Sequence, residues 1–241
     1  VWNALTFGPL NDKAKIIQEI RLPRELAAIL VGAALGVSGA IMQAMTRNPL
    51  ADPGLLGLTA GANAALALVI VLFPKIEYFG IMIACFFGAA LGAALVFGIG
   101  ASKKGGFSPL RIVLAGSAIS AFLYAIAEGI GIYFKIAQDV SQWTSGGLVG
   151  STWGQLQVIT PVIAIGIVIA FIFSRQLTIL SLSEEVALGL GQNIQRIKAV
   201  LYVVVILLAG AAVALVGNMA FIGLMIPHIV RAIVGTDYRF I

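Results

Sequence analysis

The side chains that could carry out chemistry are few in this chain and stand far apart. Its 241 residues include one histidine, His228, one cysteine, Cys85, and ten acidic residues. A nucleophilic triad, a metal cluster or a phosphate-binding loop needs several such groups at matched spacing, and the sequence holds none. A single cysteine also excludes an intrachain disulfide. The sequence therefore predicts a protein that is not an enzyme and that needs no metal or cofactor.

Two of these groups lie inside apolar stretches. His228 directly follows Pro227, and a neutral, hydrogen-bonded histidine that secures a kink is favoured over a ligand or a proton relay. Glu128 lies about two helical turns from the end of its apolar stretch. It could line a water-filled cavity, because an unpaired buried carboxylate is costly, or it could be a hydrated or paired glutamate near the interface. The residues alone do not separate these two interpretations.

A polar segment, Ser174–Lys198, carries two acids and three bases between apolar stretches of membrane length. It is longer than a simple connection needs, and it predicts two short helices separated at Gly189–Gly191. Ser183 is placed to cap the first of them, with Glu184 and Glu185 at the positive end of the helix dipole. Two acids suit an anionic lipid surface poorly, so a protein partner is favoured over an amphipathic helix lying on the membrane.

Arg21 and Arg24 precede the first long apolar stretch. Chemistry alone favours interfacial arginines that reach toward lipid headgroups. The alternative is a docking point for an extracytoplasmic protein, in which each guanidinium grips a carboxylate through two hydrogen bonds.

The composition indicates which kind of secondary structure positions these residues. Hydrophobic residues make up 60% of the chain and charged residues 10%, with a mean hydropathy of +1.05. Soluble domains are about a quarter charged, so we expect an all-α polytopic membrane protein in contact with lipid. Six full spans are expected, at Leu26–Thr46, Leu55–Phe73, Phe79–Ala101, Ile112–Phe134, Leu156–Phe173 and Ala199–Val216. A seventh apolar segment, Ala220–Val234, is short and contains Pro227, so it should be kinked or partly re-entrant.

The lysines and arginines predict the orientation, because they are enriched on the cytoplasmic side. Lys75 and Lys135 are then outside, and the polar segment 174–198 is inside. The connection Lys135–Gln155 is expected to hold a short outer surface helix. No basic run of the kind that binds nucleic acid is present. The residues assigned to the inside are Arg47, Lys103, Lys104, Arg111, Arg175, Arg196, Lys198, Arg231 and Arg239.

Small residues suggest close helix packing and an internal repeat. Gly32/Gly36, Gly57/Gly61 and Gly88/Gly92 recur at four residues, which favours tight packing within the bundle. The segments Gly32–Gly39 and Gly210–Gly217 are similar, and each is followed by a proline at the same distance. An odd number of crossings separates them, so they would form an inverted repeat, although chance similarity is an equal alternative. The repeat would leave the chain short at its C-terminus.

Four stretches together resemble the permease family of binding-protein-dependent ABC importers for iron-siderophores, haem and cobalamin. The resemblance covers essentially the whole chain. The stretches are RLPRELAAILVGAALGVSGAIMQAMTRNPLADPGLLGLTAGA from Arg21, LAGSAISA from Leu114, LSLSEEVALGLGQN from Leu180 and GNMAFIGLMIPHIVRAIVG from Gly217.

The resemblance implies a BtuC-like permease bundle with an inverted repeat, of which residues 1–241 would supply about seven of ten transmembrane helices as one domain. Most of the first helix and the last two helices would be missing. It also implies a second permease subunit, identical or different, two cytoplasmic ATP-binding subunits and an extracytoplasmic substrate-binding protein, in a bacterial cytoplasmic membrane. The motion would be ATP-driven alternating access.

The resemblance also assigns residues. Arg21 and Arg24 match arginines that meet glutamates of the binding protein, which reverses the preference stated above. Ile112–Phe134 matches a helix that lines the central pathway, which makes Glu128 a candidate wall residue. The residues that match ATPase-coupling helices within 174–198 are Ser183, Glu184, Glu185, Ala187, Leu190 and Gly191.

Iron-siderophore complexes are the expected substrate because they are frequent in the family, and the residues do not separate them from haem or cobalamin. The leading rival class is an inverted-repeat secondary transporter, which should carry several ionisable residues near the middle of the membrane. A membrane enzyme is a weaker rival, since catalytic groups are lacking.

Overall fold

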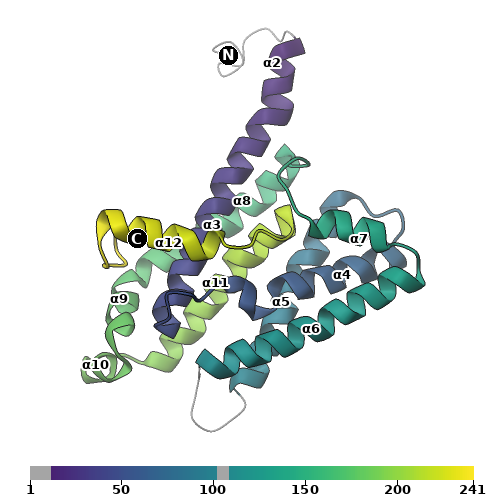
Figure 1. The fold of residues 1–241 in the computed structure, drawn as a ribbon. Coiled ribbons are helices and arrows are strands. Elements are labelled where there is room, and N and C mark those ends of the chain that lie inside the picture. The colour runs from purple at the N-terminus through teal and green to yellow at the C-terminus, as the bar shows by residue number, and fades with distance from the viewer. Residues whose placement is uncertain (1–11, 102–108) are drawn as a thin grey trace.

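The computed structural model describes residues 12–101 and 109–241, and all the regular elements within them are helical (Figure 1). Lys103 and Lys104 lie outside the described residues. In chain order the elements are α2 (Asp12–Ile16), the π-helix η1 (Ile17–Arg21), α3 (Leu22–Thr46), the 3-10 helix η2 (Pro53–Leu56), α4 (Leu58–Leu72), α5 (Tyr78–Ala101), α6 (Pro109–Tyr133), α7 (Ala137–Thr144), α8 (Trp153–Ile172), α9 (Ser174–Leu182), α10 (Glu184–Gly189), α11 (Ile194–Val216) and α12 (Ile222–Val234).

Each predicted span corresponds to a helix, so the all-α polytopic prediction is confirmed. Five helical stretches of the described chain are long and apolar enough to cross a membrane, while α4 and α12 are shorter. The start of the first span was predicted too late, because α2, η1 and α3 form one continuous helical run from Asp12 to Thr46. The second span, expected from Leu55, begins instead with η2, and its α-helix starts at Leu58.

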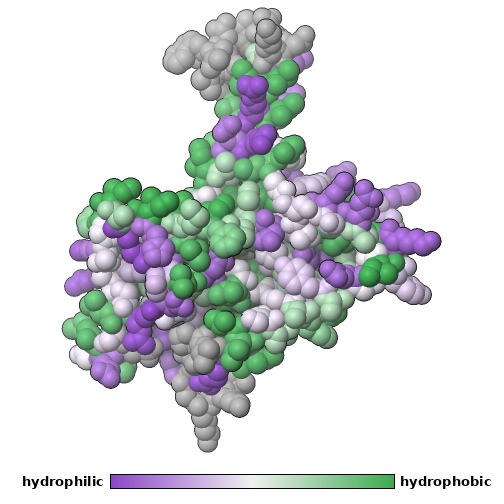
Figure 2. Space-filling model, in the orientation of Figure 1, coloured by the Kyte–Doolittle hydropathy of each residue, from purple (hydrophilic) through white to green (hydrophobic). Residues whose placement is uncertain are grey.

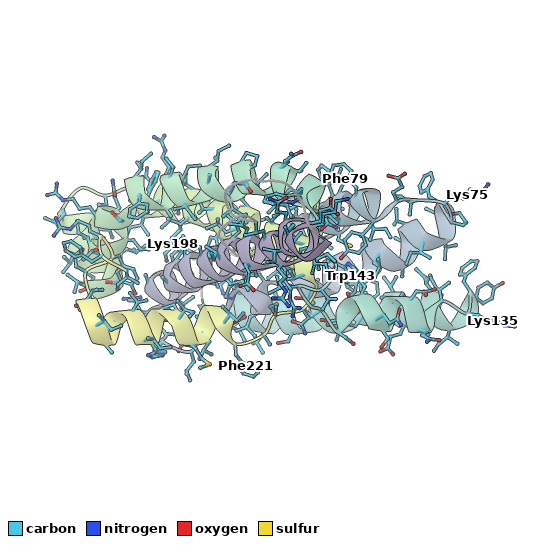
Figure 3. All side chains as sticks on the ribbon, turned by 90° about the horizontal axis from the view of Figure 1, so that it is seen from above. Lys75, Phe79, Lys135, Trp143, Lys198 and Phe221 are labelled. Atoms are coloured by element: carbon cyan, nitrogen blue, oxygen red, sulfur yellow. The ribbon has the colours of Figure 1, made fainter. Side chains whose placement is uncertain are left out.

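The charges separate along the bundle as predicted. Lys75 and Lys135 lie at one end and Lys198 at the other (Figure 3). We call the end with Lys75, Lys135 and α7 the outer end, and the end with α9, α10 and Lys198 the inner end. In Figure 2, hydrophilic residues gather over α7 and over the region of α9. The predicted outer surface helix within Lys135–Gln155 is confirmed as α7.

The core is built around α11, which is buried along most of its length and packs against α3, α5 and α8. Tight packing at glycines is confirmed for two of the three predicted pairs. A Cβ on Gly61 would lie 2.1 Å from the Gly88 carbonyl oxygen, and one on Gly92 would lie 2.4 Å from that of Gly57. Gly32 departs from the prediction, because a Cβ there would meet nothing within 4 Å.

The helices α3 and α11 run in opposite directions (Figure 1), which is the arrangement that an inverted repeat requires. Each leads through an irregular segment into a shorter helix, α4 or α12. The N-cap residues of these two helices, Gly57 and Phe221, both have left-handed backbone conformations, with φ of 73° and 68°. The short helices therefore start in the same way in both halves.

Candidate functional site

Ser183 separates the two short helices at the inner end. Its backbone is extended, with φ −161° and ψ 157°, and its Oγ accepts a hydrogen bond from the Val186 N–H at 3.0 Å. This satisfies one of the free N–H groups at the start of α10, so the predicted N-cap is confirmed. The predicted break at Gly189–Gly191 is confirmed, because α10 ends at Gly189 and the next helix, α11, begins at Ile194 and continues into the following span. The helix α9, which precedes Ser183, was not predicted.

Apolar side chains of α10 and its flanks are left uncovered. Val186 is 46% exposed, and Leu188 and Leu190 are each 62% exposed. Glu185 is also exposed, whereas the side chain of Glu184 lies outside the described set. Ala187, assigned by resemblance to the coupling surface, is fully buried on the opposite side of α10, because one side of so short a helix must pack on the bundle. Ala187 can position α10 but cannot contact a partner in this conformation.

Gly191 ends α10. Its φ is +75°, a conformation that favours glycine, and its N–H donates to the Leu188 carbonyl oxygen at 2.9 Å. The N–H of Gln192 donates to the Ala187 carbonyl oxygen at 3.0 Å, which completes a Schellman motif. Asn193 then caps α11 by accepting from the Arg196 N–H at 3.2 Å. These caps fix the angle at which α10 leaves the bundle.

Arg21 and Arg24 lie far from α10, both exposed, on the helical arm that rises from the body in Figure 1. Three residues apart, they share one face of the helix. Pro23 has no N–H, and the N–H of Leu22 donates to Ile17 in the π-helical pattern, so neither bonds the Gln18 carbonyl. The indole Nε1–H of Trp153 donates to that carbonyl oxygen at 2.9 Å. The start of α8 thus holds the arm three residues before Arg21, on the side of the arm's tip.

Glu128 lines a cavity of about 450 Å³ between α4, α6 and α7. The carboxylate is exposed, which favours the cavity-wall interpretation over a buried pair. Hydroxyl and amide groups share this wall, and the Thr144 Oγ1–H donates to Oδ1 of the buried Asn63 at 3.1 Å. The cavity is therefore polar on several sides.

A second cavity, of about 310 Å³, lies deeper along α6, and Tyr124 lines both. Its wall includes Asp52, Thr59 and Ser120. Asp52 caps η2 by accepting from the Gly54 N–H at 2.7 Å, and burial raises the pKa of its carboxyl group. One face of α6 thus borders polar space from the outer end toward the middle of the bundle.

Near the inner end, α12 is attached to α3 by polar contacts that the sequence did not suggest. Arg231 donates from its guanidinium to Oε1 of Gln43, and Nε2 of Gln43 donates to the Leu224 carbonyl oxygen at 3.1 Å. Gln43 is only 3% exposed, and a lone glutamine in an apolar helix was the available signal. The predicted hydrogen bond of His228 is confirmed, because its Nε2 lies 3.2 Å from the Pro49 carbonyl oxygen.

Within the described residues, no group of three or more histidine, cysteine, aspartate or glutamate side chains could hold a metal ion. The candidate site has three parts: the exposed apolar side chains of α10, the two arginines on the arm, and two cavities along α6 whose walls include polar side chains.

Comparison with known proteins agrees with this arrangement. Residues 1–241 match the FecCD transport family over their whole length. The chain belongs to this family. It is 46% identical to the iron(3+)-hydroxamate import system permease protein FhuB of Bacillus subtilis (strain 168), covering 100% of this chain and 63% of that protein. It is 39% identical to the hemin transport system permease protein HmuU of Yersinia pestis, covering 100% of this chain and 72% of that protein.

The fold also matches a solved structure of the same kind. A metal-chelate type ABC transporter in an inward-facing conformation superposes with a TM-score of 0.86 and 27% sequence identity, covering 96% of this chain and 74% of that chain. The chain thus spans a little under two thirds of the length of FhuB and about three quarters of the solved protein. The resemblance noted in the sequence, and the bundle that it implied, are confirmed.

Proposed function

We propose that this chain is the transmembrane permease subunit of a binding-protein-dependent ABC importer for iron chelates in a bacterial cytoplasmic membrane. A loaded binding protein docks at the outer end, and two ATPase subunits bind the inner ends of a permease dimer. ATP binding and hydrolysis then drive alternating access. The permease hydrolyses nothing and uses no cofactor.

The observation that carries this proposal is the uncovered apolar surface of α10. Val186, Leu188 and Leu190 are exposed on a capped helix at the inner end, and exposed apolar groups of this kind mark interaction sites. Glu185 stands beside them and adds a charged rim, as is usual for a protein interface. A groove on an ATPase subunit is the partner that we assign to this surface, with Ser183, Glu184 and Gly191 setting its start and end.

On the helical arm, Arg21 and Arg24 supply two exposed guanidinium groups. Guanidinium binds carboxylate through two hydrogen bonds, so acidic residues of the binding protein are the matching chemistry. Between the two ends, the cavities along α6 give the chelate a polar route, with Glu128 in its wall.

Iron-hydroxamate is the substrate class that we favour, because the relative with 46% identity imports it. The relative named for hemin is 39% identical, so haem is the second candidate, and cobalamin the third. Uptake of labelled ferric hydroxamate, hemin and cobalamin by cells that carry the complete system, each tested alone, ranks the three.

The assembly is tested by co-purification of the full-length protein with its ATPase subunit. Glu185→Lys combined with Leu188→Lys should reduce recovery of the ATPase about 30-fold or more, since charges would be placed in an apolar contact. The matched control is Asp139→Lys, the same acid-to-base change on the exposed outer helix α7, which should leave recovery unchanged. Equal recovery from both variants would remove α10 from the interface.

Docking is tested separately with Arg21→Glu and Arg24→Glu together. This variant should lose binding of the loaded binding protein while it retains the ATPase. Normal docking to this variant would return Arg21 and Arg24 to a lipid-facing role.

A further inference from the structure

The turn that follows α12, Gly235–Ile241, folds back onto the short helix α9. The hydroxyl of Thr178 in α9 makes two contacts with it. Thr178 Oγ1 accepts from the Tyr238 N–H at 3.1 Å, and its single hydroxyl hydrogen is shared between Asp237 Oδ1 at 3.2 Å and the Ser174 carbonyl oxygen within α9 at 3.1 Å. Thr178 therefore links α9 to this turn by hydrogen bonds.

The turn is itself preorganised. The Arg239 guanidinium donates to both carboxylate oxygens of Asp237, with an Nη2–Oδ2 distance of 2.5 Å, and the Arg239 N–H donates to Oδ1 at 3.0 Å. These bonds lower the pKa of Asp237 to about 2, so the carboxylate stays charged at any physiological pH. The acceptor presented to Thr178 is therefore fixed in place and in charge.

The other side of the turn reaches α3 and α12. The ring of Tyr238 is half-buried and lines a crevice with Ala40 of α3 and Leu177 of α9. Tyr238 also interacts with Arg231, whose guanidinium donates to the buried Gln43. A continuous set of polar contacts therefore runs from α9 through the turn to α12 and to the inner end of α3.

We propose that Thr178 and Asp237 form a positioning joint, which makes α12 and the inner end of α3 move together with the ATPase-facing helices α9 and α10. This inference rests on the proposed function, because it assigns a route for motion that the ATPases supply. Helices that pack only through apolar side chains can slide past one another, whereas paired hydrogen bonds fix their relative position. Apart from this joint, α9 packs on the bundle through the buried apolar side chains of Leu177 and Leu180.

The joint is tested in the complete transporter, reconstituted in proteoliposomes with its ATPase subunits and binding protein. Thr178→Val keeps the size of the side chain and removes the hydroxyl, with its two contacts to the turn and its contact to Ser174. Thr178→Ser keeps the hydroxyl. Asp237→Ala is the second variant, chosen because Asp237 is at the surface and its side chain is 29% exposed. The readout is stimulation of ATP hydrolysis by binding protein loaded with ferric hydroxamate, together with iron uptake per ATP.

Thr178→Val and Asp237→Ala should retain their ATPase subunits but lose stimulation by at least about fivefold, equivalent to one hydrogen bond. Thr178→Ser should stay within about twofold of wild type. A purely structural role would lower the yield of complex and leave stimulation per complex unchanged, and that result would overturn the joint. If the wild-type chain retained no ATPase subunit, the proposed function would fail first, and the joint with it.

Discussion

Gly39→Ala should destabilise the protein by forcing α12 away from α3. A Cβ on residue 39 would lie 1.8 Å from the carbonyl oxygen of Gly223, and 2.6 Å and 2.8 Å from its carbonyl carbon and Cα. Real Cβ contacts are essentially never under 3.0 Å, so α12 must move by about 1.2 Å. All three atoms belong to the backbone, so no rotamer change can relieve the contact.

The size of the effect follows from two opposing terms. Replacing glycine by alanine inside a helix stabilises it by about 1 kcal/mol. Overpacking a closed contact costs roughly 1–3 kcal/mol, and the displacement also strains the Arg231–Gln43 hydrogen bond that holds α12. The matched control is Gly32→Ala, two turns earlier in α3, where a Cβ meets nothing within 4 Å. Both variants gain the helix contribution, so their free energies of unfolding should differ by the overpacking cost, about 1–3 kcal/mol.

Reversible unfolding in mixed detergent micelles, titrated with denaturing detergent, measures this difference for the full-length protein. Gly32→Ala should be as stable as wild type or slightly more stable, and Gly39→Ala should unfold earlier. If the two variants unfold together, the close approach of α3 to Gly223 does not contribute to stability and the reasoning is refuted. Iron uptake by Gly39→Ala should fall as well, because α12 carries Arg231.

Two further predictions concern the ends of the molecule. Trp153→Phe keeps an aromatic ring and removes the hydrogen bond to the Gln18 carbonyl oxygen. Affinity for the binding protein, measured by pull-down titration, should fall about 3- to 10-fold while recovery of the ATPase subunit stays normal. Unchanged affinity would mean that the position of the arm does not depend on this hydrogen bond. Gly191→Ala should reduce recovery of the ATPase subunit, because a φ of +75° costs alanine roughly 1–2 kcal/mol. The control is Gly189→Ala, where a Cβ meets nothing within 4 Å, and it should leave recovery unchanged. Equal recovery from both variants would show that the angle of α10 is unimportant for ATPase binding.

Much of the fold could be predicted because membrane-length apolar runs and the residues between them follow simple rules. The spans, the outer helix α7 and the N-cap at Ser183 depend on local sequence, and each was predicted correctly. Boundaries were less accurate. The helix that contains Leu26 begins at Asp12. The length of the apolar stretch did not predict this start, because the polar residues of the arm suggest a connection between helices.

The contacts that hold the candidate site together could not be read from the sequence. Gln43 and Arg231 are 188 positions apart, and Trp153 and Gln18 are 135 apart, so no local pattern joins them. The small-residue pattern was also ambiguous. Gly32 and Gly61 have the same four-residue spacing, yet only Gly61 faces another backbone, since spacing marks a smooth helix face without naming its neighbour.

Pro23 shows how a local rule becomes a long-range contact. Proline in a helix leaves a carbonyl oxygen without its donor, and a buried or interfacial carbonyl needs another partner. In the π-helical turn at Ile17–Arg21, the Leu22 N–H donates to the Ile17 carbonyl oxygen, and the Gln18 carbonyl oxygen accepts from Trp153 at the start of α8. The segment Arg21–Arg24 therefore contributes more than its two charged side chains. Because Pro23 has no N–H, the Gln18 carbonyl oxygen can accept from Trp153, and this contact fixes the arm that carries the two arginines.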